Sequence, residues 1–351
     1  MINRRDFLRS RTLAENAGRL LGVLDEVQFV DEMPPVESAV LRVAQRAMAT
    51  RFEVLVPFGV PYAQQAAEDA FAEIDRLESQ LSVYRDTSEV SRLNCMAWSA
   101  PIPVEEGLFD LLRLAARVNA ETEGAFDITA GALVKAWGFY KGPRRIPSDK
   151  ERLQALARVG MPYVALDPER LQVRYLRPGL EINLGSIGKG YALDRAGRVL
   201  VDSWNFSSVL LHGGQSSVYA KGNEPGSTHG WPVGIRHPWD PETRMAVVHL
   251  RDRALGTSAV TFQYMDHEGR KLGHILDPRT GWPAEGMASA SVVAPTAAEA
   301  DALATAFFIV GIEKARAYCA AHPSIGAILL PEGASVPTVL NLRSPEITLA
   351  P

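Results

Sequence analysis

Apolar residues recur with helical spacing in two long segments of the first third of the chain. Between residues 63 and 81 one helical face would carry Ala67, Ala70, Phe71, Ile74, Leu77 and Leu81. Between residues 105 and 121 the same spacing is made by Leu108, Leu111, Leu112, Ala115 and Val118. Gly124 then stands where a helix stop is expected. The pattern predicts amphipathic helices over 63–81 and 105–121.

Other segments of the chain lack helical spacing and contain alternating or short apolar runs, which are typical of strands. The clearest is the RFEVLV segment at 51–56, and the folded body is expected to begin near Val43. Further strands are predicted at 163–166, 171–175, 208–211, 231–235, 245–250 and 289–294, with helices at 187–202, 297–309 and 311–321. Because the strands cluster without a strict βαβ alternation, the chain is predicted to be α+β, with mixed or antiparallel sheets and interspersed helices.

Composition narrows the class of protein. The 351 residues are 46% hydrophobic and 22% charged, as in an ordinary soluble globular protein. A net charge of −4 gives no electrostatic reason to expect a nucleic-acid partner. No apolar run is long enough to span a membrane. The two cysteines, Cys95 and Cys319, lie in unrelated contexts and are expected to be reduced thiols.

Residues 1–45 are predicted to be an N-terminal extension before a domain at 46–345. Asn3 to Arg9 is similar to a twin-arginine export signal, but the following segment is interrupted by charged residues and lacks a small-residue cleavage site. The alternative is an amphipathic helix, with Leu13, Leu20, Leu21 and Leu24 on one face. A cytoplasmic or membrane-peripheral location is favoured, and export stays open.

The segment from 273 to 305 carries the first candidate chemistry. Asp301 and Thr305 are four residues apart, so on a helix they offer two hard oxygen ligands on one face, which suits Mg²⁺. The alternative is a carboxylate that favours the helix dipole and a threonine that bonds back to a carbonyl. His274 and Asp277 are expected where a strand runs into a turn, and both could equally be structural.

A glycine-rich turn at 183–194 would open a helix. Such a helix entry can bind phosphate, with Lys189 as the counter-charge, although it is equally often structural. Asp127 could be a helix N-cap or a ligand contact. Tyr84 and Trp137 are expected to be half-buried aromatics, and either could flank a planar ring.

Taken together and in order, these segments resemble the ApbE family, the FAD:protein FMN transferases, over about residues 46–330. The matching segments are AMATRFEVLV, LSVYRDTSEVSRLN, GAFDITAGALVKAWGF, EINLGSIGKGYALD, LLHGGQ, ALGTSA, GHILDPRTG and AEADALATAFFIVG. The resemblance implies a single ApbE-like, T-fold-related domain. It also implies transfer of FMN from FAD, as a phosphoester, to a Ser or Thr in the flavinylation motif of an acceptor protein, with AMP leaving.

The resemblance also assigns roles to particular residues. FAD, as substrate, would be contacted by Met48, Tyr84, Ala125, Phe126, Asp127, Asn183, Lys189 and Ile275. Mg²⁺ would be bound by the main-chain oxygen of Ser186 and the side chains of Asp301 and Thr305. His274 is the candidate for proton handling, because an imidazole can be poised near neutral pH. Lys189 would stabilise the developing phosphoryl charge.

Three positions depart from the family pattern. Ala259 replaces the Gly of TSG, Gln215 follows the paired glycines in place of Asp or Asn, and Asn183 replaces a frequent Asp. These changes bear on flavin affinity and rate more than on the class of reaction. Two alternatives remain, an FAD diphosphatase that releases FMN and AMP and a non-catalytic FAD-binding protein.

Overall fold

A large antiparallel sheet forms the centre of the computed structural model, which describes residues 39–259, 265–267 and 270–349. Within these ranges eight strands follow the order β1-β2-β6-β7-β10-β13-β14-β15, and each pairs antiparallel with its neighbours. Their bounds are β1 (Val40–Ala47), β2 (Thr50–Pro57), β6 (Val209–Gly213), β7 (Ser217–Lys221), β10 (Arg253–Ala259), β13 (Met287–Ala294), β14 (Gly326–Pro331) and β15 (Thr338–Leu340).

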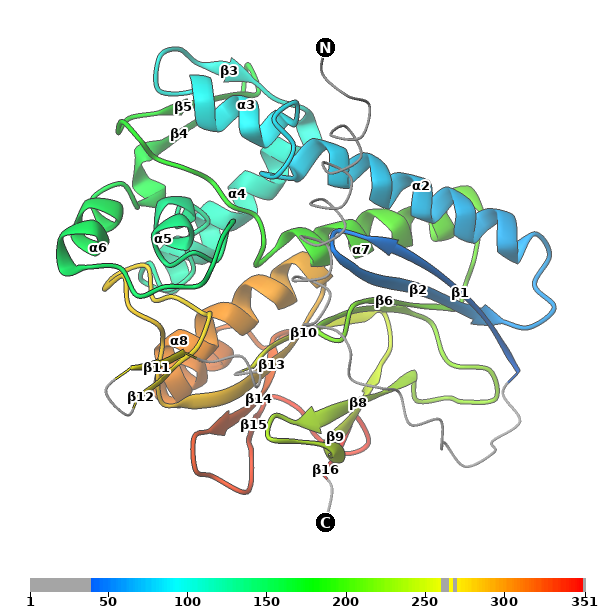
Figure 1. The fold of residues 1–351 in the computed structure, drawn as a ribbon. Helices are drawn as coiled ribbons and strands as arrows, with labels where there is room; N and C mark the ends of the chain where they lie inside the picture. The colour runs from blue at the N-terminus through cyan, green and yellow to red at the C-terminus, as the bar shows by residue number, and fades with distance from the viewer. Residues whose placement is uncertain (1–38, 260–264, 268–269, 350–351) are drawn as a thin grey trace, which may run out of the picture.

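Three helices cover one face of this sheet (Figure 1). They are α2 (Ala63–Leu81), α7 (Gly188–Arg198), which continues as a π-helical turn η2 (Val199–Ser203), and α8 (Ala297–Ala321). The apolar stripe of α2 is buried in the main core, as its spacing requires. The helices therefore lie between the sheet and the rest of the main core.

The opposite face of the sheet packs on a second, three-stranded sheet. Its strands are β8 (Trp231–His237), β9 (Asp240–Leu250) and β16 (Ile347–Leu349), in the order β16-β9-β8. Trp231 and Val248 of this sheet share a buried cluster with Leu210, Leu255 and Val293 of the large sheet. Each face of the central sheet is thus buried, which fixes its register.

A peripheral group of elements lies on the left side of the molecule as drawn in Figure 1. It contains α3 (Glu89–Met96), α4 (Glu106–Glu121), α5 (Gly131–Ala136), α6 (Asp149–Leu156), the 3₁₀ turn η1 (Met161–Tyr163) and a small sheet of β3 (Ile102–Pro103), β5 (Gln172–Tyr175) and β4 (Val164–Asp167). The hairpin β11 (Met265–His267) and β12 (Arg270–Leu272) precedes the 273–281 turn.

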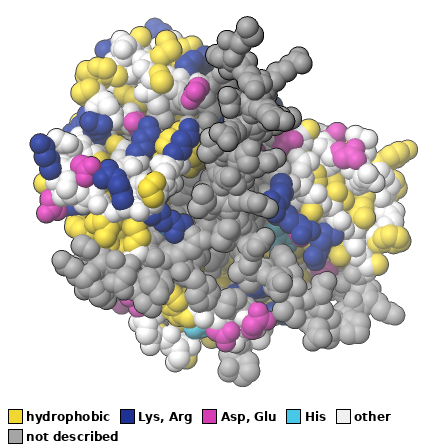
Figure 2. All heavy atoms as spheres, viewed as in Figure 1, with side chains coloured by type: hydrophobic (Ala, Val, Ile, Leu, Met, Phe, Trp, Pro, Cys, Tyr) yellow, Lys and Arg dark blue, Asp and Glu magenta, His cyan; other side chains and the backbone are white. Residues whose placement is uncertain are grey.

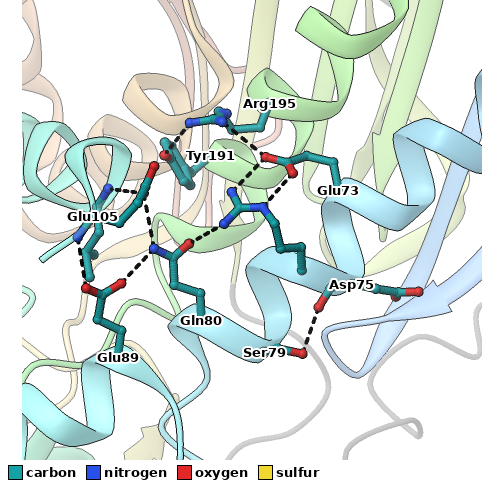
Figure 3. A network of polar contacts seen from close by, with 10 residues as sticks. Glu73, Asp75, Ser79, Gln80, Glu89, Glu105, Tyr191 and Arg195 are labelled. Carbon is teal, nitrogen blue, oxygen red and sulfur yellow. Dashed lines mark hydrogen bonds and ion pairs between the residues drawn. The ribbon is translucent and has the colours of Figure 1, made fainter.

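A surface network of polar side chains joins this peripheral group to α2 and α7 (Figure 3). Gln80 of α2 donates to Glu89 at 2.8 Å and to Glu105, the N-cap of α4, at 3.1 Å. Arg195 of α7 pairs with Glu73 of α2 at 3.3 Å. Each exposed ion pair stabilises by no more than about 1 kcal/mol. The network therefore contributes little to the stability of the fold.

Most predicted elements are observed. The body begins at Val40, inside the predicted extension, and the predicted signal or amphipathic helix lies outside the described residues. The break predicted between the two C-terminal helices is confirmed at Gly311, where φ is 77° and the backbone is not helical. His274 follows shortly after the end of β12, as expected for a strand that runs into a turn, and the turn itself contains the isolated bridge Leu276–Pro283. Trp137 is fully buried, not half-buried. Among the described residues, no helix combines the length and apolar character needed to cross a membrane.

Candidate functional site

The N-terminal ends of α7 and α8 meet and cap each other. Gly190 in the first turn of α7 donates its N–H to Oδ2 of Asp301 at 2.8 Å. In return, Asp194 of α7 accepts the N–H groups of Ala297 and Ala298, at 2.8 and 2.9 Å. N–H groups that a helix leaves unpaired at its start are thereby satisfied by the other helix. We call residues 188–194 and 297–301 the α7–α8 joint.

Glycine is required at two contacts around α8. A Cβ on Gly190 would lie 2.1 Å from the carbonyl oxygen of Ala297. A Cβ on Gly256 of β10 would lie 2.5 Å from the main-chain carbon of Ala300. Backbones at these two places therefore approach more closely than any side chain allows. The glycine-rich segment predicted as a phosphate-binding turn thus has a packing role as well.

Asp301 is a buried carboxylate with few charge partners. Burial raises its pKa to about 7, opposed by the nearby Lys189 and by hydrogen bonds from Ser217 and Gly190. The Ser217 hydroxyl donates to Oδ1 at 2.8 Å and to Oδ2 at 2.9 Å. Burial likewise raises the pKa of Asp194 to about 6. A cation bound beside Asp301 would favour its ionised form.

Thr305 lies one helical turn after Asp301. Its hydroxyl donates to the Asp301 carbonyl at 3.3 Å, the back-bond that the structural alternative predicts. The same oxygen lies 3.2 Å from Oγ of Ser258 in β10. A hydroxyl has two acceptor positions besides its single proton, so the back-bond does not exclude metal ligation.

The protein oxygens at this site suit a cation whose other ligands are supplied by water and substrate. The carboxylate of Asp301 and the hydroxyl of Thr305 offer two hard oxygens one helical turn apart, and Ser186 lies in the turn just before α7. The described residues include no group of three or more His, Cys, Asp or Glu side chains suited to hold a metal ion. Mg²⁺ often binds through one or two carboxylates and substrate phosphates, so these oxygens suit it.

His274 lies on a well-braced turn. The turn at 273–281 is fixed by Trp137, whose Nε1 donates to the Gly281 carbonyl at 3.0 Å, and by Arg152, which donates to the Thr280 carbonyl at 2.7 Å. Asp277 accepts two side-chain bonds from Arg279, at 2.9 and 2.8 Å, so it serves the turn.

The surroundings of His274 favour a neutral ring. Crowding by protein atoms lowers its pKa below the usual value, and the positive charges of Arg144 and Lys189 lower it further. Solvent still reaches the side chain, and water screens these charges in part. The positive charge of Lys189 thus acts on both His274 and Asp301.

A second group of predicted residues lies along the 125–131 turn. Asp127 accepts from the N–H and hydroxyl of Thr129, at 2.8 and 2.6 Å, and from the Met161 N–H at 3.0 Å. It therefore fixes its own turn and is not a helix N-cap; burial raises its pKa. Asn183 lies beside this turn, because its N–H donates to the Ile128 carbonyl at 2.7 Å. Its Oδ1 accepts from Gly185, within the glycine-rich turn.

Three further residues with an implied flavin role are Ala125, Phe126 and Ile275. Ala125 and Phe126 have buried side chains, so the part of the 125–131 turn that a ligand could reach there is mainly backbone. Ile275 is partly buried against the main core, and its carbonyl accepts from Ala284 at 2.8 Å.

Met48 and Arg85, the neighbour of Tyr84, both contact α2. Met48 lies in the two-residue turn between β1 and β2 with φ 50°, and its N–H donates to Glu78 of α2 at 2.7 Å. A non-glycine residue in this conformation is strained, which often marks a functional site. Glu78 also pairs with Arg85, the neighbour of Tyr84, at 3.3 Å. Glu78 thus links two positions that are separate in the sequence.

The Tyr84 ring lies on a second aromatic ring. It stacks on Tyr140 with centroids 4.8 Å apart and planes within 8°. Lys135 and Lys141 lie 5.2 and 5.0 Å from the centre of the Tyr140 ring. Figure 2 shows Lys and Arg side chains gathered over α5 and α6 on this face. A planar, anionic ligand would find both an aromatic surface and positive charge here.

Sequence reasoning missed several residues that build this site. Asp194 stood inside a quoted motif but carried no assigned role, and Glu78 looked like any exposed helix residue. Ser217 follows the paired glycines in β7 without a recognisable signal. All three act on partners at least 30 residues away in the chain. Such pairings have no local pattern.

Comparisons with known proteins agree with this architecture. The ApbE family model matches residues 48–329. The FAD:protein FMN transferase of Escherichia coli (strain K12) is 33% identical over 280 residues, 77% of this chain and 78% of that protein. The corresponding protein of Klebsiella pneumoniae (strain 342) is 34% identical over 253 residues, 70% of this chain and 71% of that one.

Solved structures are also similar to this chain. The ApbE protein of Thermotoga maritima superposes with a TM-score of 0.77 at 28% identity, covering 85% of this chain and 96% of that one. The flavin transferase ApbE of Vibrio cholerae gives 0.75 at 25% identity, covering 86% and 96%. With a family model that spans most of the fold and relatives above 30% identity, the chain belongs to the ApbE family.

Proposed function

We propose that this chain is a Mg²⁺-dependent FAD:protein FMN transferase. The observation that carries the proposal is the α7–α8 joint, which places the carboxylate of Asp301 one helical turn from Thr305 and close to Lys189. Support also comes from relatives that are named FAD:protein FMN transferases. FAD is the substrate, and a Ser or Thr in the flavinylation motif of an acceptor protein receives FMN.

The proposed step is a displacement at phosphorus. The acceptor hydroxyl oxygen forms a bond to the phosphorus on the FMN side of the FAD diphosphate, and the bond from that phosphorus to the oxygen of AMP breaks. The hydroxyl proton passes to His274, whose neutral ring is favoured by the lowered pKa. AMP leaves with the displaced oxygen, and FMN stays on the acceptor as a phosphoester.

The main-chain oxygen of Ser186 and the side chains of Asp301 and Thr305 would hold Mg²⁺. When bound, the ion would neutralise charge on the diphosphate. Lys189 adds a positive charge at the same end of α7, where N–H groups of the helix start also favour anions. The residues proposed to bind the flavin portion and diphosphate of FAD are Met48, Tyr84, Ala125, Phe126, Asp127, Asn183, Lys189 and Ile275.

A single incubation tests this proposal against its alternatives. The protein is mixed with FAD, Mg²⁺ and an acceptor that carries a Ser/Thr flavinylation motif, and the acceptor is weighed by mass spectrometry. A covalent FMN adduct is expected, and it should be absent from a matched acceptor whose target residue is replaced by alanine. AMP with free FMN would instead identify a diphosphatase, and intact bound FAD would identify a binding protein.

A further inference from the structure

Ser217 lies directly beneath the Asp301 carboxylate. It is the first residue of β7 and pairs across the sheet with Gly256, the residue over which α8 packs closely. Its side chain has no solvent exposure, and its hydroxyl contacts both carboxylate oxygens. Ser216 Oγ, the neighbouring hydroxyl, is 3.5 Å away, at the limit for a hydrogen bond. The Asp301 carboxylate is therefore the principal partner of the Ser217 hydroxyl.

The two donors on Asp301 restrict how its carboxylate can turn. An ionised carboxylate offers about four acceptor positions. In Asp301, Oδ2 receives the Gly190 N–H and shares the Ser217 hydroxyl, whereas Oδ1 receives only the shared hydroxyl. One donor comes from a helix and the other from a strand of the central sheet, so neither moves with α8 alone. This arrangement leaves Oδ1 with the greater free acceptor capacity.

We propose that Ser217 is a positioning residue, whose hydroxyl orients Asp301 so that a carboxylate oxygen faces the bound metal and the diphosphate. This inference rests on the proposed function and adds to it a residue from a different element. Without the hydroxyl, a buried carboxylate loses a donor and the restraint on its rotation. Partners that orient metal ligands commonly affect metal affinity by about 10- to 100-fold.

The test compares two variants of equal shape. Ser217→Thr keeps a hydroxyl, whereas Ser217→Val replaces it with a methyl group of similar size. Binding of Mn²⁺ alone, as a probe for Mg²⁺, is followed by loss of the free-ion EPR signal. We expect Ser217→Val to weaken Mn²⁺ binding about 10- to 100-fold and Ser217→Thr to recover most of the affinity. The Mg²⁺ concentration for half-maximal transfer should shift in the same order.

Two further variants separate position from packing. Ser291→Ala removes an equally buried hydroxyl from strand β13, which is separated from β7 by β10, but that hydroxyl bonds to Thr257 at 2.8 Å and not to Asp301. It should leave Mn²⁺ affinity close to that of the parent. Ser217→Ala removes the Ser217 hydroxyl without adding volume, which keeps the test valid if the β-branched variants do not fold.

Equal Mn²⁺ affinity for the folded threonine and valine variants, or parental affinity in Ser217→Ala, would overturn the inference. Asp301→Ala distinguishes this from failure of the proposed metal site. If Asp301→Ala abolishes Mn²⁺ binding while Ser217→Val does not weaken it, only the role of Ser217 is wrong. If Asp301→Ala binds Mn²⁺ like the parent, the metal assignment itself is wrong.

Discussion

The α7–α8 joint and the 273–281 turn contribute the two halves of the proposed chemistry and are fixed in different ways. In the joint, Asp301 is buried and receives donors from α7 and β7, and glycine contacts leave no spare volume. In the turn, the bracing bonds reach the carbonyls of Thr280 and Gly281, while His274 itself is exposed. The region proposed to bind the metal is thus fixed by close packing, whereas the region proposed to accept the proton is fixed by hydrogen bonds to a surface turn.

The largest expected effect is at the joint. Asp301→Ala should lower FMN transfer about a thousandfold or more, because several kcal/mol of charge stabilisation depend on the bound metal. The measurement is the initial rate of acceptor flavinylation at saturating Mg²⁺. Glu299→Ala is the matched control, since Glu299 lies on the same helix turn but pairs with Arg117 at 2.6 Å. Mg²⁺-dependent transfer that survives Asp301→Ala would place the metal elsewhere.

A smaller effect is expected in the turn. His274→Ala should lower transfer about a hundredfold through loss of proton acceptance, while Mn²⁺ binding stays close to that of the parent. Transfer rates across pH and EPR titration with Mn²⁺ measure the two quantities. His322→Ala controls for loss of an imidazole, because His322 stacks on Tyr318 at the end of α8. Unchanged transfer in His274→Ala would remove the residue from the mechanism.

Glycine substitutions should destabilise the protein more in the α7–α8 joint than in the 273–281 turn. Gly190→Ala places a methyl group 2.1 Å from the Ala297 carbonyl oxygen, so we expect a loss of at least about 1–3 kcal/mol in the free energy of unfolding. Gly273→Ala, beside His274, meets nothing within 4 Å and should change it by less than about 0.5 kcal/mol. Urea unfolding measures both. Similar losses in the two variants would contradict the difference in packing.

The smallest expected effect is on the pH dependence of stability, to which Asp301 and His274 should contribute with opposite signs. Burial raises the folded-state pKa of Asp301 to about 7, so its contribution to the stability of metal-free protein falls as pH rises from about 4 to about 7. The pKa of His274 is lowered, so its contribution falls as pH drops below about 6.5.

The measurement is the melting temperature of the parent and of each variant across this pH range, without metal. The contributions of Asp301 and His274 to it should change with pH in opposite directions. Asp301→Asn should remove part of the loss seen on raising pH, and His274→Gln part of the loss seen on lowering it. The change for His274 should be the smaller of the two, since water already screens its side chain. Changes of the same sign would show that the environment of one residue is misassigned.

The sequence predicted best those elements whose signal is local. The helix at 63–81 has the predicted bounds, and the helix predicted at 105–121 begins one residue later, because apolar spacing alone defines the buried face. The break near residue 310 was also foreseen and falls at Gly311. In contrast, β7, β10 and β14 were not predicted, although β10 and β14 lie inside the central sheet beside the recognised strand β13.

The residues of the candidate site also divide into those with a local sequence signal and those without one. Asp301 and Thr305 were identified because i,i+4 spacing on a helix is a local property. The turn that carries His274 was expected, but the support that it receives from Trp137 and Arg152, which lie in other elements, was not. Asp127 was left open between two roles, and the contact with Met161, 34 residues away, shows that it braces a turn.

By itself, the sequence determined the fold class, the principal helices and a set of motifs whose order is that of the ApbE family. Only the tertiary structure decided that α7 and α8 cap each other and that Ser217, 84 residues before Asp301, lies under its carboxylate. The physical reason is the distance along the chain between the residues that interact. Helix spacing and glycine turns are set by neighbours in the chain, whereas the partner of a buried carboxylate depends on which strands pair and how closely a helix packs on them.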